Sequence, residues 1–212
     1  MLRRIARELA LRGHEGPFRR LFRPGGREWA ELLRERGDFR ELGSDCYIDP
    51  WALIEGRHFI SIGSNVRIAT SALFCHDGSV NMINRAYGLK LDSVGPIQIR
   101  DNVYIGYGVI VLPGVSIGPN AIVSAGSVVR SNVGEGEIVA GVPARPVGRL
   151  DVSVAILKSK NAKYPWRELI EKRAAEYDAG MEGELNRMRA AYFFGGEEGG
   201  ATSRPGSSSR RT

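Results

Sequence analysis

Apolar residues recur along the middle of this chain with a period of six. One series contains Ile99, Ile105, Val111, Ile117, Val123 and Val129. A second series of small or aliphatic residues runs four positions behind it and contains Val103, Val109, Val115, Ala121, Ser127 and Val133. Helices repeat near 3.6 residues and strands near two, and an antiparallel sheet would vary its turn spacing. A period of six therefore predicts a β-helix of short strands that turn a corner after each repeat.

The same period occurs earlier in the chain, in two stretches. One contains Leu42, Ile48 and Ile54, and the other contains Ile62, Ile68 and Phe74. The two stretches differ in phase by two residues, which predicts a bulge near Ile60. Three strands of six residues make a coil of about eighteen residues, so the covered stretch predicts about five coils. The repeat stops between Cys75 and Gly95, and we expect residues 75–95 to leave the β-helix as a loop.

Four segments follow from this pattern. We expect a basic helical arm over residues 1–41, the β-helix over residues 42–150, and a helical segment over residues 151–194 with a break near Gly180. The end of the chain, residues 195–212, is rich in glycine, serine and arginine, which predicts a disordered tail. The fold class is therefore mainly β, with helical appendages at both ends.

The first forty residues carry most of the net positive charge. They hold eleven arginines against six acidic residues, a balance of +5 out of the +6 of the whole chain. Apolar residues at helical spacing predict two short helices, one with Leu2, Ile5, Leu9 and Leu11 and one with Trp29, Leu32 and Leu33. A basic amphipathic helix can lie on an anionic membrane surface. It can equally pack on the β-helix or on a neighbouring subunit, and no motif here predicts nucleic-acid binding.

Composition narrows the class of protein further. Two cysteines, Cys46 and Cys75, give no disulfide framework in a chain of 212 residues. No apolar run approaches the roughly twenty residues of a membrane span, and the first residues lack the apolar core of a secretion signal. We therefore expect a soluble cytoplasmic protein.

His76 is the strongest candidate for chemistry among three histidines. It stands where the chain leaves the repeat, whereas His14 lies in the basic arm and His58 in an irregular coil. An imidazole at the mouth of a loop on a rigid scaffold suits a general base, although it could simply cap the loop through Asp77. A zinc site of the β-helix carbonic anhydrase type needs three histidines, and the repeat region holds two. No metal is expected.

A family resemblance extends these inferences. The segment GPIQIRDNVYIGYGVIVLPGVSIGPNAIVSAGSVVRSNVGEGEIVAGVPARPVGRL, together with the preceding His76-Asp77-Gly78, resembles the hexapeptide-repeat acyltransferases. The pattern is closest to their galactoside, maltose and polysaccharide O-acetyltransferase branch, and it covers residues 45–150. The resemblance implies a left-handed parallel β-helix, an exception to the usual right-handed crossover. It also implies a homotrimer whose active sites lie between neighbouring subunits.

The resemblance further implies an O-acetyltransferase that uses acetyl coenzyme A and a hydroxyl of a sugar or glycan, without a covalent enzyme intermediate. His76 would be the general base, and the backbone N–H of Tyr107 would stabilise the oxyanion. The implied coenzyme A contacts are Tyr107, Ala125, Arg130, Ser131 and Arg145. The implied acceptor contacts are Asp49, Asp77, Arg85 and Tyr104.

Two positions depart from the family pattern. Tyr104 stands where the family often has tryptophan, and Arg130 lies one position before its usual lysine. Transfer to an amine or to serine, or a non-catalytic β-helix that serves in assembly, are the alternatives to sugar O-acetylation.

Overall fold

The structure is a computed structural model that describes residues 1–195 of the chain. Residues 196–212, on which nearly all of the expected disordered tail falls, lie outside the described residues. The chain divides into two compact units, Met1–Ser153 and Val154–Thr212.

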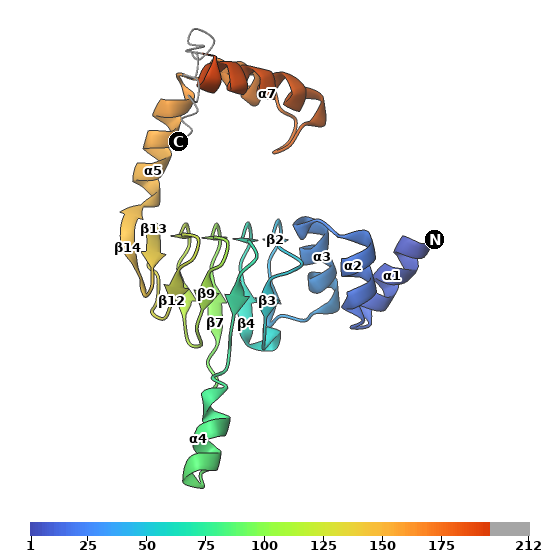
Figure 1. The fold of residues 1–212 in the computed structure, drawn as a ribbon, viewed down its shortest axis with the longest axis vertical. Coiled ribbons are helices and arrows are strands. Elements are labelled where there is room, and N and C mark those ends of the chain that lie inside the picture. Colours follow the sequence, from blue (N-terminus) through green and yellow to red (C-terminus); the bar gives the residue numbers. More distant parts are fainter. Residues whose placement is uncertain (196–212) are drawn as a thin grey trace, which may run out of the picture. The chain divides into compact units, whose positions relative to one another are not determined.

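Short strands of the first unit stack into three sheets, as Figure 1 shows. The first sheet contains β1 (Glu41–Leu42), β4 (Ile60–Ile62), β7 (Ile97–Ile99) and β10 (Ser116–Ile117). The second contains β2 (Tyr47–Ile48), β5 (Arg67–Ile68), β8 (Tyr104–Ile105), β11 (Ile122–Val123), β13 (Glu137–Gly141) and β14 (Ala144–Arg149). The third contains β3 (Leu53–Ile54), β6 (Ala72–Leu73), β9 (Ile110–Val111) and β12 (Val128–Val129). Consecutive strands β1 to β12 visit the three sheets in turn, and their pairing is parallel. This confirms the parallel β-helix.

The coils follow the predicted count closely. Strands β1 to β12 form four complete coils, and a fifth begins where Val133 bridges to Ile117 and β13 pairs with β11. The stack then ends, because β14 turns back and pairs antiparallel with β13.

Both six-residue series point into the β-helix. Every member from Ile99 to Val133 is buried, including the hydroxyl-bearing Ser127, whose Oγ donates to the carbonyl of Ser124 at 2.7 Å. The phase of the repeat changes near Ile60 through a 3-10 turn, and the register of β4 with its neighbours contains no bulge. This turn, η1 (Arg57–Phe59), precedes β4, and both Ile60 and Ile62 point inward from that strand.

One predicted inward position is wrong. Leu73, not Phe74, is buried and pairs with Ile54 and Val111 in the neighbouring coils. The step from Ile68 to Leu73 therefore spans five residues instead of six, and Phe74 points outward. Leu73 and Phe74 are both apolar, so the sequence pattern did not distinguish between them. The corner before β6 is one residue shorter than the corners that keep the six-residue period.

The turns that join the sheets form three edges along the stack. We call residues 55–59, 74–96, 112–115 and 130–132 the histidine edge, which runs from the third sheet to the first. Residues 49–52, 69–71, 106–109 and 124–127 form the tyrosine edge, from the second sheet to the third. On the remaining edge, Asn65, Asn102 and Asn120 adopt left-handed φ values of 55° to 57°. Their side-chain amides form a ladder, with hydrogen bonds of 2.9 and 3.0 Å between successive coils.

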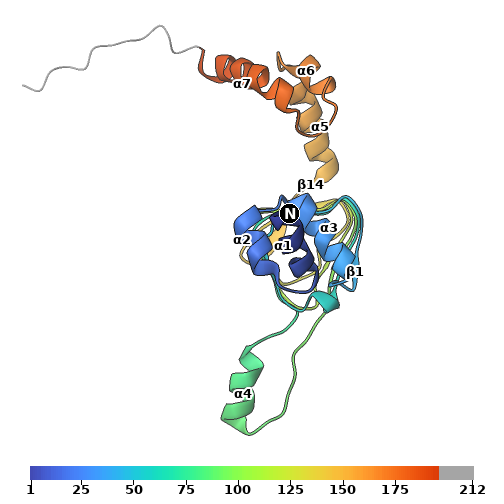
Figure 2. The same cartoon turned by 90° about the vertical axis from the view of Figure 1, so that its right-hand side faces the viewer.

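The excursion between β6 and β7 contains a helix that the sequence did not predict. This helix, α4 (Ser79–Tyr87), has no buried residue and projects from the β-helix (Figures 1 and 2). At the base of the excursion, residues on either side of it pair antiparallel through a bridge between His76 and Val94.

Three helices, not two, precede the β-helix. They are α1 (Leu2–Leu11), α2 (Glu15–Phe22) and α3 (Gly26–Arg36). Helix α3 buries Trp29, Leu32 and Leu33 and packs beside β2. Helix α1, in contrast, buries Ala6 and Ala10. Its larger apolar side chains, those of Leu2, Ile5 and Leu9, face solvent.

An ion-pair network fastens these helices to the first coils. Arg57 lies 2.8 Å from the carboxylate of Glu15 and 2.7 Å from that of Asp38, and Arg36 contacts the same two carboxylates. Burial alone would raise the pKa of Glu15, but the hydrogen bonds and charges of Arg57 and Arg36 outweigh it and lower that pKa. Glu15 is therefore ionised near neutral pH.

The second unit consists of helices. Helix α5 (Leu150–Asn161) begins in the first unit and is followed by α6 (Arg167–Glu171) and α7 (Ala179–Phe194). Trp166 is buried beside Tyr164, Tyr192 and Phe193. The break expected near Gly180 lies between α6 and α7, and Asp178 caps the start of α7 by accepting from the backbone N–H of Gly180 at 3.0 Å. The break lies before Asp178.

Candidate active site

His76 sits at the narrow base of the excursion. Hydrogen bonds of 3.0 Å from Asp77 to Ser93 and of 2.8 Å from Gly95 to Cys75 hold the two strands of this base together. Side chains alternate sides along an extended segment, so the inward positions of Leu73 and Cys75 place Phe74 and His76 outward. The histidine is thus held on a rigid backbone while about half of its side chain stays accessible.

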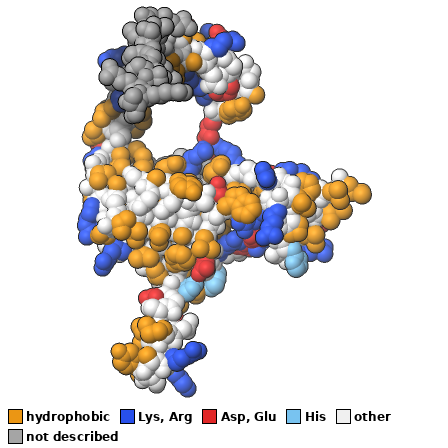
Figure 3. Space-filling model, viewed as in Figure 1, with side chains coloured by type: hydrophobic (Ala, Val, Ile, Leu, Met, Phe, Trp, Pro, Cys, Tyr) orange, Lys and Arg blue, Asp and Glu red, His pale blue; other side chains and the backbone are white. Residues whose placement is uncertain are grey.

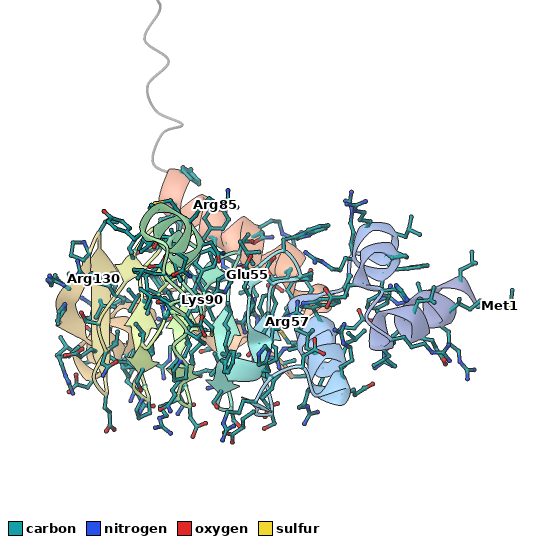
Figure 4. The ribbon with its side chains drawn as sticks, turned by 90° about the horizontal axis from the view of Figure 1, so that it is seen from below. Met1, Glu55, Arg57, Arg85, Lys90 and Arg130 are labelled. Carbon is teal, nitrogen blue, oxygen red and sulfur yellow. The ribbon has the colours of Figure 1, made fainter. Side chains whose placement is uncertain are left out.

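An open cavity of about 690 Å³ surrounds His76 along the histidine edge. Its lining comes from four consecutive coils, with Glu55 after β3, His76 after β6, Leu112 after β9 and Arg130 after β12. Asp77, Gly78, Ser93, Phe74 and Pro113 complete the lining. In Figure 4 Glu55 and Arg130 appear on the side from which α4 projects. The cavity brings one imidazole, one guanidinium and two carboxylates to the same surface.

Asp77 is engaged locally. Its Oδ1 accepts from the backbone N–H of Ser79 at the start of α4, at 2.9 Å. This hydrogen bond lowers the pKa of Asp77, so the carboxylate is ionised near neutral pH. The carboxylate of Asp77 thus forms the turn that begins the excursion. The imidazole of His76 takes no part in this hydrogen bond.

Cys75 and Cys46 both point inward and are buried. Burial raises the pKa of both thiols, which disfavours the thiolate that a nucleophile requires. Neither cysteine is therefore suited to form an acyl-enzyme, although Cys75 directly precedes His76.

A second group of predicted residues gathers on the tyrosine edge. Tyr107 and Ala125 lie on adjacent coils, where the carbonyl of Tyr107 accepts from the N–H of Gly126 at 2.8 Å. Gly106 lies so close to the next coil that a Cβ there would stand 2.6 Å from the nitrogen of Ala125. The backbone N–H of Tyr107 has no acceptor within residues 1–195. Asp49 occupies the same edge, and its Oδ1 accepts from the N–H of Trp51 at 2.7 Å.

The remaining predicted residues lie elsewhere. Tyr104 is on the outer face of the second sheet, and Arg145 is in β14 of that sheet. Arg85 is on α4 and does not line the cavity, whereas Ser131 directly follows Arg130 on the histidine edge. Within one chain, His76, Asp77 and Arg130 therefore line the same cavity. Tyr107 and Ala125 lie on the other side of the third sheet, on the tyrosine edge.

Sequence reasoning missed Glu55 and Phe74. Glu55 Oε2 lies 3.4 Å from Nε2 of His76, and Phe74 lines the cavity beside both. The available signal was the repeat itself, because Glu55 directly follows the inward Ile54 and must point outward.

Residues 1–195 contain no group of three or more His, Cys, Asp or Glu side chains that could hold a metal ion. Nor do any of the helices described here have both the length and the apolar character needed to cross a membrane.

Comparison with known proteins identifies the repeat. Residues 96–131, which include β7 to β12, match the family described as bacterial transferase hexapeptide (six repeats). The galactoside O-acetyltransferase of Escherichia coli is 31% identical over 60% of this chain and 63% of its own length. A 2,3,4,5-tetrahydropyridine-2,6-dicarboxylate N-acetyltransferase of Staphylococcus aureus is 44% identical over 26% of this chain and 23% of its own. The predicted resemblance to hexapeptide-repeat acyltransferases is therefore confirmed.

The similarity covers only part of each relative's length. The chain matches 44% to 63% of the length of its curated relatives from Schizosaccharomyces pombe, Saccharomyces cerevisiae, Escherichia coli and Lactococcus lactis. Among solved structures, a maltose O-acetyltransferase from Clostridium difficile 630 is 23% identical, with a TM-score of 0.46 over 59% of this chain and 86% of that one.

Proposed function

We propose that this protein is an O-acetyltransferase that transfers the acetyl group of acetyl coenzyme A to a hydroxyl of a sugar or glycan. The observation that carries the proposal is the accessible His76 in a cavity along the histidine edge of the hexapeptide coils, which Arg130 also lines. The likeness to a galactoside O-acetyltransferase supports the sugar acceptor. The left-handed winding implied by the resemblance is part of the same proposal.

His76 would take the proton of the acceptor hydroxyl while its oxygen attacks the thioester carbonyl. The resulting oxyanion would accept a hydrogen bond from the backbone N–H of Tyr107, which has no acceptor within residues 1–195. Coenzyme A is a good leaving group, so no acyl-enzyme is needed. The high pKa of the buried Cys75 thiol agrees with direct transfer.

The donor phosphates would bind arginine and nearby polar groups. Arg130 lines the end of the cavity that is farthest from Glu55, and Ser131 follows it. Arg145 is exposed on β14. Guanidinium groups offer several donors in a fixed plane, which suits phosphate oxygens. Asp49, Asp77, Arg85 and Tyr104 remain the proposed acceptor contacts.

A homotrimer would complete the site. His76 and Tyr107 lie on different edges of one chain, so both can face one substrate only if a second copy brings its tyrosine edge to the histidine edge. Light scattering should give the mass of three chains. A fully active monomer would contradict the shared site.

The N-terminal arm would rest on an anionic membrane surface. Met1, Ile5 and Leu9 form an exposed apolar stripe bordered by Arg4, Glu8 and Arg12, with Glu8 3.8 Å from Arg4. Apolar side chains gather at this end of the first unit in Figure 3. Such a stripe with flanking cations fits an interfacial helix. Ile5→Glu should abolish sedimentation with phosphatidylglycerol vesicles. Ile156→Glu is the matched control, since the two isoleucines are 49% and 51% exposed. Equal sedimentation of both variants would contradict the contact.

The central experiment is a coenzyme A release assay across sugars, amino sugars and serine. Release with a neutral sugar, absent in His76→Ala, is the expected result. Release only with an amine or with serine would show that the acceptor is not a sugar and would favour an amine- or serine-directed acetyltransferase. Failure to bind acetyl coenzyme A would favour a non-catalytic assembly protein.

A further inference from the structure

Glu55 and His76 are brought together by strand pairing. Glu55 follows β3 and His76 follows β6, and these strands pair in parallel with Ile54 opposite Leu73. The pairing continues past the strand ends, because the N–H of Glu55 donates to the carbonyl of Leu73 at 3.1 Å. Ile54 and Leu73 point inward, so Glu55 and His76 emerge on the same outer side of the stack.

The carboxylate of Glu55 faces one nitrogen of the imidazole. Its Oε2 lies 3.4 Å from Nε2 of His76, and both side chains remain about half accessible. The other charged groups of the cavity are Asp77 and Arg130. Asp77 is bound to the N–H of Ser79, and no hydrogen bond or ion pair joins either of these groups to His76 within residues 1–195. Asp77 acts on His76 only through its charge, and this interaction is the smallest of the causes that lower the pKa of Asp77, whereas Glu55 is the carboxylate within ion-pair distance of the imidazole.

We infer that Glu55 is a positioning residue for the acetyl transfer proposed above, and the inference rests on that function. Its carboxylate holds the proton of His76 on Nε2 and leaves the lone pair of Nδ1 for the acceptor hydroxyl. The same carboxylate stabilises the imidazolium that forms when His76 takes the proton. This is the work that a carboxylate performs for histidine in hydrolase triads.

The transfer balances with these groups alone. The acceptor O–H bond breaks and its proton passes to Nδ1 of His76, while a bond forms from the acceptor oxygen to the acetyl carbon. The tetrahedral intermediate then collapses as the carbon–sulfur bond breaks. The proton on Nδ1 passes to the departing thiolate, which gives free coenzyme A and regenerates the neutral histidine.

Three substitutions separate the contributions of Glu55. Glu55→Gln keeps an acceptor for the Nε2 proton but removes the charge, Glu55→Ala removes both, and Glu55→Asp keeps the charge on a shorter side chain. Glu41→Gln is the matched control, because Glu41 is an exposed glutamate of the first sheet outside the cavity. Each variant is tested as the full chain for kcat, for KM of both substrates, and for thermal unfolding.

We expect Glu55→Gln to lower kcat by about tenfold and Glu55→Ala by more, with both KM values nearly unchanged. The pH profile of kcat should differ between Glu55→Gln and the unsubstituted protein, because the variant lacks the carboxylate charge that faces Nε2 of His76. Glu55→Asp should recover part of the lost rate. A purely structural role would lower the melting temperature and leave the pH profile in place.

A second readout does not depend on activity. The ring signals of His76 are followed by NMR across pH in the unsubstituted protein and in Glu55→Gln. A lower titration midpoint in the variant is expected. If the protein transfers no acetyl group while this midpoint moves, the proposed function fails and the pairing stands. An unchanged midpoint together with an unchanged kcat in an active enzyme would overturn the role of Glu55.

Discussion

Arg130 and His76 line the same cavity, although β9 lies between the strands that they follow. Paired strands are about 4.8 Å apart, so the backbones of the two residues are separated by about 10 Å along the histidine edge. A long arginine side chain can bridge part of that distance. This spacing puts a cation on the same cavity wall as His76, where the proposed donor would bring its phosphates.

Substitution of Arg130 by alanine should therefore weaken donor binding. We expect KM for acetyl coenzyme A to rise by about tenfold with kcat largely kept, because a phosphate contact acts equally on the ground state and the transition state. Arg145→Ala should behave in the same way if both arginines hold phosphates. Arg100→Ala is the control, since Arg100 contacts Gln98 and lies outside the cavity. A collapse of kcat at constant donor KM would assign Arg130 a different role.

Substitution of His76 by alanine should remove the general base. The expected loss of turnover is about 10²- to 10⁴-fold, with little change in melting temperature because the side chain is half exposed. The control is His58→Ala, which removes an imidazole that packs beside Phe59. Steady-state rates and thermal unfolding of both variants provide the measurement. Turnover by His76→Ala at the unsubstituted rate would exclude His76 as the base.

The register at Leu73 decides which residues reach the cavity. The sequence offered Leu73 and Phe74 as neighbouring apolar choices, and a strict period of six favours Phe74. By alternation, an inward Phe74 would also turn His76 inward, away from any substrate. The five-residue step from Ile68 to Leu73 instead buries Leu73 and Cys75 and exposes Phe74 and His76 to the cavity. The period alone could not reveal this, because corner length is set by packing against the neighbouring coils.

Other features depended on contacts between distant segments. The pairing of Glu55 with His76 requires the alignment of β3 with β6, which a single sequence predicts only if every corner length is known. Helix α2 was missed because two glycines and a proline lie within residues 13–17, a composition typical of a turn, yet proline is tolerated in the first turn of a helix. The inward series from Ile99 to Val133 was predictable because each residue repeats the same local environment.

Substitution of Cys75 by alanine should leave acetyl transfer intact. Burial raises the pKa of this thiol, so it is a poor nucleophile near neutral pH. In the native state both cysteines should react slowly with a disulfide reagent such as Ellman's reagent, and they should react fully after denaturation. Activity of Cys75→Ala within about twofold of the unsubstituted rate is expected, since no step needs the sulfur. Loss of activity in a folded Cys75→Ala would point to an acyl-enzyme.

Acid should weaken the attachment of the N-terminal helices. The folded pKa of Glu15 lies below its ordinary value of 4.5, so its ion pairs stabilise the fold fully above that value. This contribution is lost as the pH falls through the lowered pKa, because the unfolded chain then binds the proton more readily. Urea unfolding at neutral pH and below about pH 4 measures the effect. Glu15→Gln should be less stable at neutral pH and show a shallower loss in acid. An identical acid dependence in both proteins would remove Glu15 from the explanation.

Replacing Ile117 by aspartate should prevent folding. Ile117 is fully buried in β10, where it packs between the coils of Ile99 and Val133, and a carboxylate there would have no partner. Burying an unpaired charge is among the most costly single substitutions. Ser116→Asp is the matched control, because Ser116 occupies the same strand and points outward. Circular dichroism should find a folded Ser116→Asp that melts within a few degrees of the unsubstituted protein, while Ile117→Asp is unfolded or insoluble. Equal tolerance at the two positions would contradict the inward register of the whole six-residue series.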